Sequence, residues 1–302
     1  MEPKANITPS NVVTDHRRCW RECLYVYPVI SRRAGGVSVG VNLNIDKRCT
    51  FGCVYCQVNR RLHRPTTDVD PARLQRELDE TLAAILNGEL WREERFEKTP
   101  PEMRRINDIA FSGDGEPTCL PNFDQAVAAA VEALRGNNLP GKVKIVVITN
   151  ASRLDQPQVL RALPLLDANG GEFWVKLDAG TEEFFKKINR PAAGLTLDTI
   201  CRNILSVAKD RPVVIQTLLF RLYGKPPADG EIRAYCQRLQ DILDAGGKIR
   251  LVQIHTVARN PAEPFVSYLP EEELRALAVH IARELPDLTM EVYPGVDAPP
   301  QE

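Results

Sequence analysis

The sequence predicts an α/β fold with a parallel sheet, because strand-like and helical segments alternate from Gly36 onward. The segment 143–148 is β-branched except for Lys144, as expected of a strand buried on both faces. Six core strands suit a doubly wound sheet or a partial barrel and are too few for a full eight-fold barrel. Polar segments, often with glycine, follow the strands, which predicts a site on one face of the fold.

The elements follow in a regular order. Asp70 and Pro71 start the first helix, and Gly246 and Gly247 end the fourth. We expect an N-terminal extension at 1–35, a core at 36–260 and, packed on it, a C-terminal helix and strand at 261–302. The predicted strands are 40–45, 106–111, 143–148, 173–177, 213–220, 249–257 and 289–293. The predicted helices are 71–86, 122–134, 195–208, 231–245 and 270–285.

Composition narrows the function classes. The 302 residues are 43% hydrophobic and 26% charged, with a formal net charge of −1. A net charge near zero does not by itself favour binding to nucleic acid. The basic stretch 60–64 is still compatible with an anionic partner. Residues 1–15 lack the apolar segment of a secretory signal, and no stretch approaches the ~18 apolar residues of a membrane helix. We therefore expect a cytoplasmic protein with no membrane partner.

Three cysteines stand in the spacing C-x3-C-x2-C directly after the first predicted strand: Cys49, Cys53 and Cys56. Three thiolates from one loop can hold three irons of a cubane and leave the fourth iron open to an external ligand. The alternative is a structural metal-binding module without radical chemistry, since a C-x2-C pair can be half of a zinc site. No second ligand pair at similar spacing is evident.

The triplet, with the aromatic Tyr55 directly before its third cysteine, resembles the signature of the radical S-adenosylmethionine (SAM) superfamily. The resemblance implies a partial (β/α)6 TIM-like barrel with one [4Fe–4S] cluster and SAM as cofactors. In that family SAM chelates the open iron. An electron from the cluster then cleaves SAM to methionine and a 5′-deoxyadenosyl radical, which abstracts hydrogen from a substrate. The resemblance also implies a low-potential electron donor of flavodoxin or ferredoxin type.

The resemblance extends to segments after the other strands. A Gly-x-Gly-Glu segment would surround the amino group of SAM, and polar residues after the third strand would help to hold SAM. Asp178 would contact the ribose or the substrate, and Arg190 would contact a carboxylate. Tyr55 and the backbone near Ile254 would lie against the adenine. The implied SAM-binding residues are Tyr55, Gly113, Gly115, Glu116, Asn150, Ser152, Asp178, Arg190 and Ile254.

The runs Lys176-Leu-Asp-Ala, Asn189-Arg-Pro and Val252-Gln-x-x-Thr-Val-x-Arg resemble stand-alone radical SAM proteins similar to wyosine synthases. The chain departs from wyosine synthases because it lacks a clear set of three upstream cysteines and a flavodoxin domain. The sequence therefore does not choose among three classes of substrate, which are an RNA base, a peptide or protein side chain, and a small metabolite.

The five other cysteines decide whether a second cluster is present. Cys201 and Cys236 fall within predicted amphipathic helices and should be packing residues. Only Cys19, Cys23 and Cys119 could converge on a second cluster, and we predict a single cluster.

Overall fold

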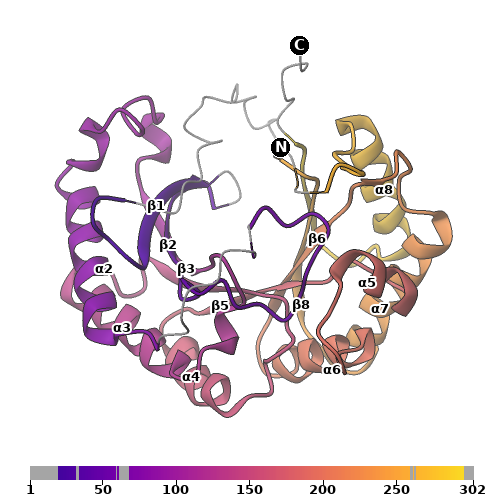
Figure 1. The fold of residues 1–302 in the computed structure, drawn as a ribbon, viewed down its shortest axis with the longest axis horizontal. Coiled ribbons are helices and arrows are strands. Elements are labelled where there is room, and N and C mark those ends of the chain that lie inside the picture. Colours follow the sequence, from indigo (N-terminus) through magenta and orange to yellow (C-terminus); the bar gives the residue numbers. More distant parts are fainter. Residues whose placement is uncertain are drawn as a thin grey trace.

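Eight strands form one curled sheet in the order β1-β2-β3-β4-β5-β6-β8-β10 (Figure 1). Strand β1 is antiparallel to β2, and every other neighbouring pair is parallel. The computed structural model describes residues 20–31, 34–58, 60, 68–258, 261 and 263–295. The strands are β1 (Val26–Ser31), β2 (Gly36–Val41), β3 (Ile106–Phe111), β4 (Lys144–Thr149), β5 (Glu172–Lys176), β6 (Val213–Leu218), β8 (Ile249–His255) and β10 (Met290–Tyr293), with β7 (Arg221–Leu222) and β9 (Val266–Ser267) forming a separate pair.

Helices form an arc around the outside of the curled sheet, and the sheet stays open between β1 and the side of α8 (Figure 1). This arrangement confirms the partial barrel and decides against the doubly wound sheet. Within the described ranges, none of the helices has the length and apolar character that a membrane crossing requires. The helices are α2 (Pro71–Leu86), α3 (Phe123–Gly136), α4 (Pro157–Ala168), α5 (Glu182–Asn189), α6 (Leu197–Ala208), α7 (Asp229–Asp244) and α8 (Glu271–Glu284), with short 3-10 turns at Leu90–Arg92, Pro101–Met103 and Pro117–Cys119.

The structure differs from the sequence prediction at the amino-terminal edge of the sheet. The first parallel strand, β2, begins at Gly36, four residues before the predicted start at Gly40. Strand β1, which falls within the segment assigned above to an extension, pairs with β2 along its whole length. All six residues of β2 and five of the six in β1 are buried, so neither strand shows the alternation that marks a half-exposed strand.

Two helices, α4 and α5, were not predicted. Pro164 lies inside α4, and an internal proline removes a helical hydrogen bond, which argues against a helix in the sequence alone. Helix α5 has only eight residues, and its clearest signal is the Thr181 side chain that caps it. Strands β6 and β8 end at Leu218 and His255, each two residues earlier than predicted.

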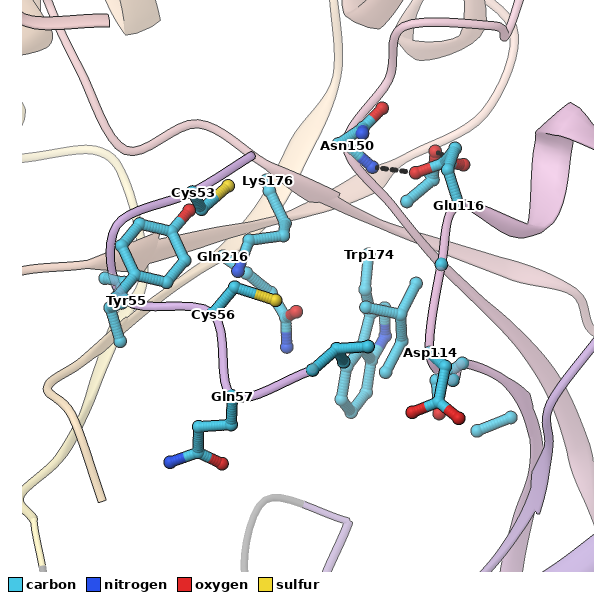
Figure 2. Close-up of a pocket in the computed structure, with 18 of the residues that line it drawn as sticks. Cys53, Tyr55, Cys56, Gln57, Asp114, Glu116, Asn150, Trp174, Lys176 and Gln216 are labelled. Carbon is cyan, nitrogen blue, oxygen red and sulfur yellow. Dashed lines mark hydrogen bonds between the residues drawn. The ribbon is translucent and has the colours of Figure 1, made fainter. Parts of the chain in front are cut away.

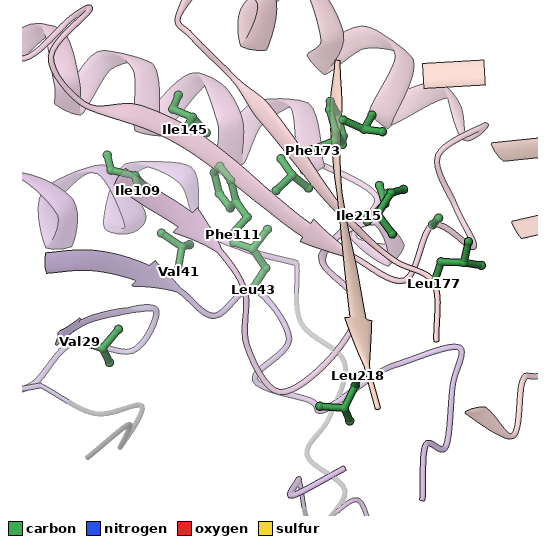
Figure 3. Packing of buried hydrophobic residues seen from close by; sticks show 14 of the residues in the cluster. Val29, Val41, Leu43, Ile109, Phe111, Ile145, Phe173, Leu177, Ile215 and Leu218 are labelled. Carbon is green, nitrogen blue, oxygen red and sulfur yellow. The ribbon is translucent and has the colours of Figure 1, made fainter. Parts of the chain in front are cut away.

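The main apolar core lies between the outer face of the sheet and the helices (Figure 3). It includes the fully buried rings of Phe111, Phe123 and Phe173. A smaller cluster on the inner face of the sheet contains Ala110, Val146, Trp174 and Val214. Because successive side chains of a strand point to opposite faces, the same strands supply both the core and the inner wall of the barrel.

Candidate active site

A cavity of about 740 Å³ lies inside the curl of the sheet. Its lining comes from the cysteine loop, from the segments after β3 and β4, and from the inner faces of the strands. This volume suits a small-molecule or cofactor site. The predicted site residues that line it are Cys49, Cys53, Tyr55, Cys56, Gly113, Gly115, Glu116 and Asn150, and those that do not are Ser152, Asp178, Arg190 and Ile254.

The cysteine loop, residues 49–56, is held by the carboxyl end of α5. The N–H of Gly52 donates to the carbonyl oxygens of Asn189 and Arg190, both at 3.1 Å. Arg190 ends α5 in the left-handed conformation, with φ of 44°. In Figure 2 the cysteine side of the cavity, with Cys53, faces the side that carries Glu116. Helix α5, which is distant in sequence, therefore holds the cysteine loop at the cavity wall.

The three thiols have the chemistry of cluster ligands. Each is a free cysteine on the cavity wall. Burial raises the pKa of Cys49 to about 12 and also raises the pKa of Cys53. A metal can displace the proton of such a thiol and bind the thiolate. The donor set therefore fits an iron–sulfur cluster.

No group of three or more His, Cys, Asp or Glu side chains in the described ranges is arranged to hold a single metal ion. A cubane takes its three thiolates on three different irons, so its sulfurs stand farther apart than the ligands of one ion. The cysteines line open cavity space, which suits the wider spacing.

Gly113 and Gly115 are required by close packing of their loop. A Cβ on Gly115 would lie 1.9 Å from the carbonyl oxygen of Arg48, and one on Gly113 would lie 2.2 Å from Oδ1 of Asn42. The segment they contact leads from β2 into the cysteine loop. The resemblance implies that these glycines surround the amino group of SAM, and packing within the chain is a second reason for them.

Glu116 is 2% exposed, yet it lines the cavity. Burial raises its pKa, and hydrogen bonds from Asn150, Thr118 and Thr149 oppose that shift. Oε1 accepts from the N–H and hydroxyl of Thr118 and from the hydroxyl of Thr149, at 3.2, 2.6 and 2.6 Å. Oε2 accepts the N–H of Asn150 at 2.7 Å, a contact drawn between these residues in Figure 2. The carboxylate thus joins the loop after β3 to the loop after β4.

Three of the predicted SAM-binding residues have other partners. The hydroxyl of Ser152 lies 2.6 Å from Oγ1 of Thr50, at the start of the cysteine loop. Arg190 forms an ion pair with Glu263. The side chain of Ile254 is fully buried in the main core, whereas the prediction concerned the backbone near it. The first two side chains support the loops around the site, and the third supports the sheet.

Asp178 lies behind the cysteine loop and anchors it. Its Oδ1 accepts the N–H of Leu218 at 2.8 Å, and its Oδ2 accepts the hydroxyl of Tyr55 and Nδ2 of Asn189. Asn189 belongs to the Asn-Arg-Pro run of the sequence but was not among the predicted site residues. No local pattern could have identified it, because its partner Cys53 lies 136 positions away.

Further residues that sequence reasoning did not assign to the site line the cavity from β5, β6 and β8. They are Trp174, Lys176, Gln216, Leu218 and His255. Lys176 and Gln216 are register partners on neighbouring strands, so they stand side by side. Alternate residues of a strand point to the same face of the sheet, so knowledge of which face is the inner one would have identified them.

The other described cysteines lie outside the cavity lining. Burial raises the pKa of Cys23 to about 11, and the nearby charges of Glu77 and Glu80 on α2 add to that shift. Burial also raises the pKa of Cys119, which follows the glycine loop, to about 11. Cys19, the third candidate for a second cluster, lies outside the described residues. Cys201 packs against the main core and Cys236 is buried in it.

A family model described as the radical SAM superfamily matches residues 43–221, a segment that runs from the cysteine loop to β7. This chain belongs to the radical SAM superfamily. Members of this superfamily are enzymes, and they use a [4Fe–4S] cluster and SAM. The matched segment contains all three cysteines, the glycine loop, Glu116 and Asn189.

Among its relatives is a UPF0026 protein of Methanocaldococcus jannaschii, which is 29% identical over 182 residues. The alignment covers 59% of this chain and 48% of that protein, so this chain spans about half the length of the relative.

Solved structures of radical SAM enzymes share the fold. A radical SAM methyltransferase from Sphaerobacter thermophilus superposes with a TM-score of 0.58 at 16% identity, covering 90% of this chain and 70% of the other. The structure of TYW1 with a lysine-pyruvate adduct bound superposes with a TM-score of 0.55 at 16% identity, covering 82% of this chain and 73% of the other. At these identities the likeness establishes the partial barrel alone.

Proposed function

We propose that this radical SAM protein binds one [4Fe–4S] cluster through Cys49, Cys53 and Cys56 and cleaves SAM in the adjoining cavity. The observation that carries the proposal is the placement of three free thiols, from one loop, on the wall of a cavity that Glu116 also lines. When bound, the cluster supplies one electron that cleaves SAM to methionine and a 5′-deoxyadenosyl radical, which abstracts hydrogen from the substrate.

Glu116 is suited to hold the ammonium group of SAM. Each carboxylate oxygen offers about two acceptor sites, and Oε2 uses one of them for Asn150. The second site of Oε2 can take a charge-assisted hydrogen bond from a cation. An ammonium there would also offset the cost of keeping a carboxylate charged in a buried position.

We propose that the substrate binds between the cysteine loop and the inner wall formed by Trp174, Lys176 and Gln216. This wall combines an indole ring, an amide and a cation, and it lines the same cavity as the cysteines. In Figure 2 Trp174 and Gln216 lie between the cysteine side and Asp114. A low-potential protein of flavodoxin or ferredoxin type would supply the electron.

The test is anaerobic reconstitution with iron and sulfide, followed by reduction with dithionite in the presence of SAM. We expect a brown protein that releases 5′-deoxyadenosine and methionine. Cys49→Ala, Cys53→Ala and Cys56→Ala should each abolish both the colour and the cleavage, because two protein thiolates are too few to hold the cubane.

Cys201→Ala is the matched control, because Cys201 lies on α6 outside the cavity lining. It should keep its colour and its activity. Full 5′-deoxyadenosine release by any variant of the triplet would refute the proposal. A colourless, zinc-containing wild type that leaves SAM intact would support the structural-module alternative.

A further inference from the structure

Each of the three cluster cysteines accepts a hydrogen bond from a side-chain nitrogen, and each nitrogen comes from a different part of the chain. Nδ2 of Asn150, after β4, lies 3.7 Å from Sγ of Cys49. Nδ2 of Asn189, at the end of α5, lies 3.5 Å from Sγ of Cys53. Nη2 of Arg60 lies 3.5 Å from Sγ of Cys56.

The orientation of Asn189 is defined by its other contacts. Asn189 is 2% exposed, and its Nδ2 also lies 3.3 Å from Oδ2 of Asp178 and 2.9 Å from the hydroxyl of Tyr55. An ionised carboxylate only accepts hydrogen bonds, so Asp178 requires the NH2 group of Asn189, and not its carbonyl oxygen, to point this way. The same NH2 group is then directed at Cys53.

Arg60 links the two loops that form the mouth of the site. Its Nη1 donates to the carbonyl oxygens of Lys47 and Asp114, and its Nη2 reaches Cys56. The guanidinium therefore brings a positive charge, as well as an N–H, to a cluster ligand.

Such contacts act on the redox state of an iron–sulfur cluster. Reduction adds one electron to the cluster, and part of the added negative charge falls on the cysteine sulfurs. An N–H that donates to a sulfur therefore stabilises the reduced state more than the oxidised state. Hydrogen bonds to the sulfurs are a known determinant of cluster potential.

We propose that Asn150, Asn189 and Arg60 set the reduction potential of the cluster by hydrogen bonding one cysteine sulfur each. Asn189 is buried and Asp178 holds its orientation, so its contact with Cys53 is the one chosen for the main test. Asp178 is a positioning residue, which acts on the cluster through Asn189. This inference rests on the proposed function, because it requires the cluster to be bound by these cysteines.

The experiment is a potentiometric titration of the full chain, reconstituted anaerobically, with dithionite and redox mediators. The electron paramagnetic resonance signal of the reduced cluster and the iron content are measured. Asn189→Leu removes the N–H at nearly constant volume. At a fixed potential it should lower the ratio of reduced to oxidised cluster about tenfold, which is about 59 mV toward more negative potential for one electron.

Asn137→Leu is the matched control. Asn137 follows α3, and its Nδ2 donates to Asp79 and to a backbone carbonyl, outside the cavity lining. This variant should keep the potential of the wild type. Arg60→Met should shift the potential in the same direction as Asn189→Leu, because it removes both an N–H and a positive charge.

An Asn189→Leu protein with about four irons per chain and an unchanged potential would overturn the inference. If Asn189→Leu does not hold four irons, Arg60→Met decides the question by the same criterion. Loss of iron from both variants would mean that these side chains only support the loop, which also overturns it. A wild type that never gains a cluster would instead contradict the proposed function.

Discussion

The carboxylate of Glu116 accepts the backbone N–H of Asn150 at 2.7 Å, although the two residues lie 34 positions apart. This contact joins two loops that follow neighbouring parallel strands, and it fixes the carboxylate at the cavity wall. The acidic group that we propose for SAM is therefore held in place before any ligand arrives.

Glu116→Gln tests that role. We expect SAM affinity to fall by about 1–3 kcal/mol, the range for a lost charge-assisted hydrogen bond, with iron content unchanged. Calorimetric titration of the reconstituted protein with SAM measures it. Thr149→Val, which removes one donor to Glu116 and keeps its charge, should weaken binding less. Equal affinities of wild type and Glu116→Gln would remove Glu116 from the SAM site.

Gly115→Ala should prevent correct assembly of the site. The added Cβ would meet the backbone oxygen of Arg48 at 1.9 Å, so the segment before the cysteine loop would have to move. We expect reduced iron content and a lower melting temperature. Gly230→Ala on α7 is the control, because its Cβ would meet nothing within 4 Å and alanine favours a helix. Normal iron content in Gly115→Ala would contradict this packing argument.

The chain should carry one cluster, hence about four irons after reconstitution. Cys23 packs beside α2, and neither it nor Cys119 lines the cavity. Cys23→Ala and Cys119→Ala should therefore leave the iron content at the wild-type value. A wild-type count about twice as high, which falls by half when Cys19 and Cys23 are both changed to Ala, would instead indicate a second cluster.

Glu77 on α2 should be a major determinant of stability. Its buried carboxylate accepts the N–H groups of Leu24, Tyr25 and Val26, at 2.9, 2.8 and 3.3 Å. Glu77→Ala leaves these donors without their acceptor and should cost about 2–5 kcal/mol in the free energy of unfolding, measured with urea. The exposed Glu80→Gln on the same helix should cost little. A cost within 0.5 kcal/mol, roughly the effect of a surface substitution, would show that β1 does not depend on Glu77.

Glu172 should make stability depend on acid pH. Burial alone would raise its pKa, but hydrogen bonds from Arg250, Trp174 and Lys144 outweigh burial and lower the pKa from 4.5 to about 2. A lowered pKa stabilises the fold above pH 4.5, and that stabilisation is lost as the pH falls toward 2. The loss should be about 3 kcal/mol. Urea unfolding across this range should give a shallower pH dependence for Glu172→Gln, and identical slopes would exclude the effect.

Much of the outer architecture was predictable, because strands such as β3 and helices such as α2 carry local signals. Strand β3 matches its predicted bounds, and α2 begins at Pro71 after the Asp70 cap, as expected. Strand β1 was not predictable, since a strand buried on both faces that follows a polar terminus shows no alternation. Helix α4 was missed because of its internal proline.

The sequence by itself indicated the superfamily, because the C-x3-C-x2-C spacing is local and three cysteines close together in one loop are a property of the chain. Only the tertiary structure decided which side chains contact those thiols. Asn189 reaches Cys53, and Asp178 fixes both Asn189 and Tyr55, through contacts between α5, β5 and the cysteine loop. Asn189 and Cys53 lie 136 positions apart in sequence and meet because the fold packs the cysteine loop against the end of α5. For that reason the cysteine motif can be recognised in the sequence, whereas the residues that contact and position its side chains cannot.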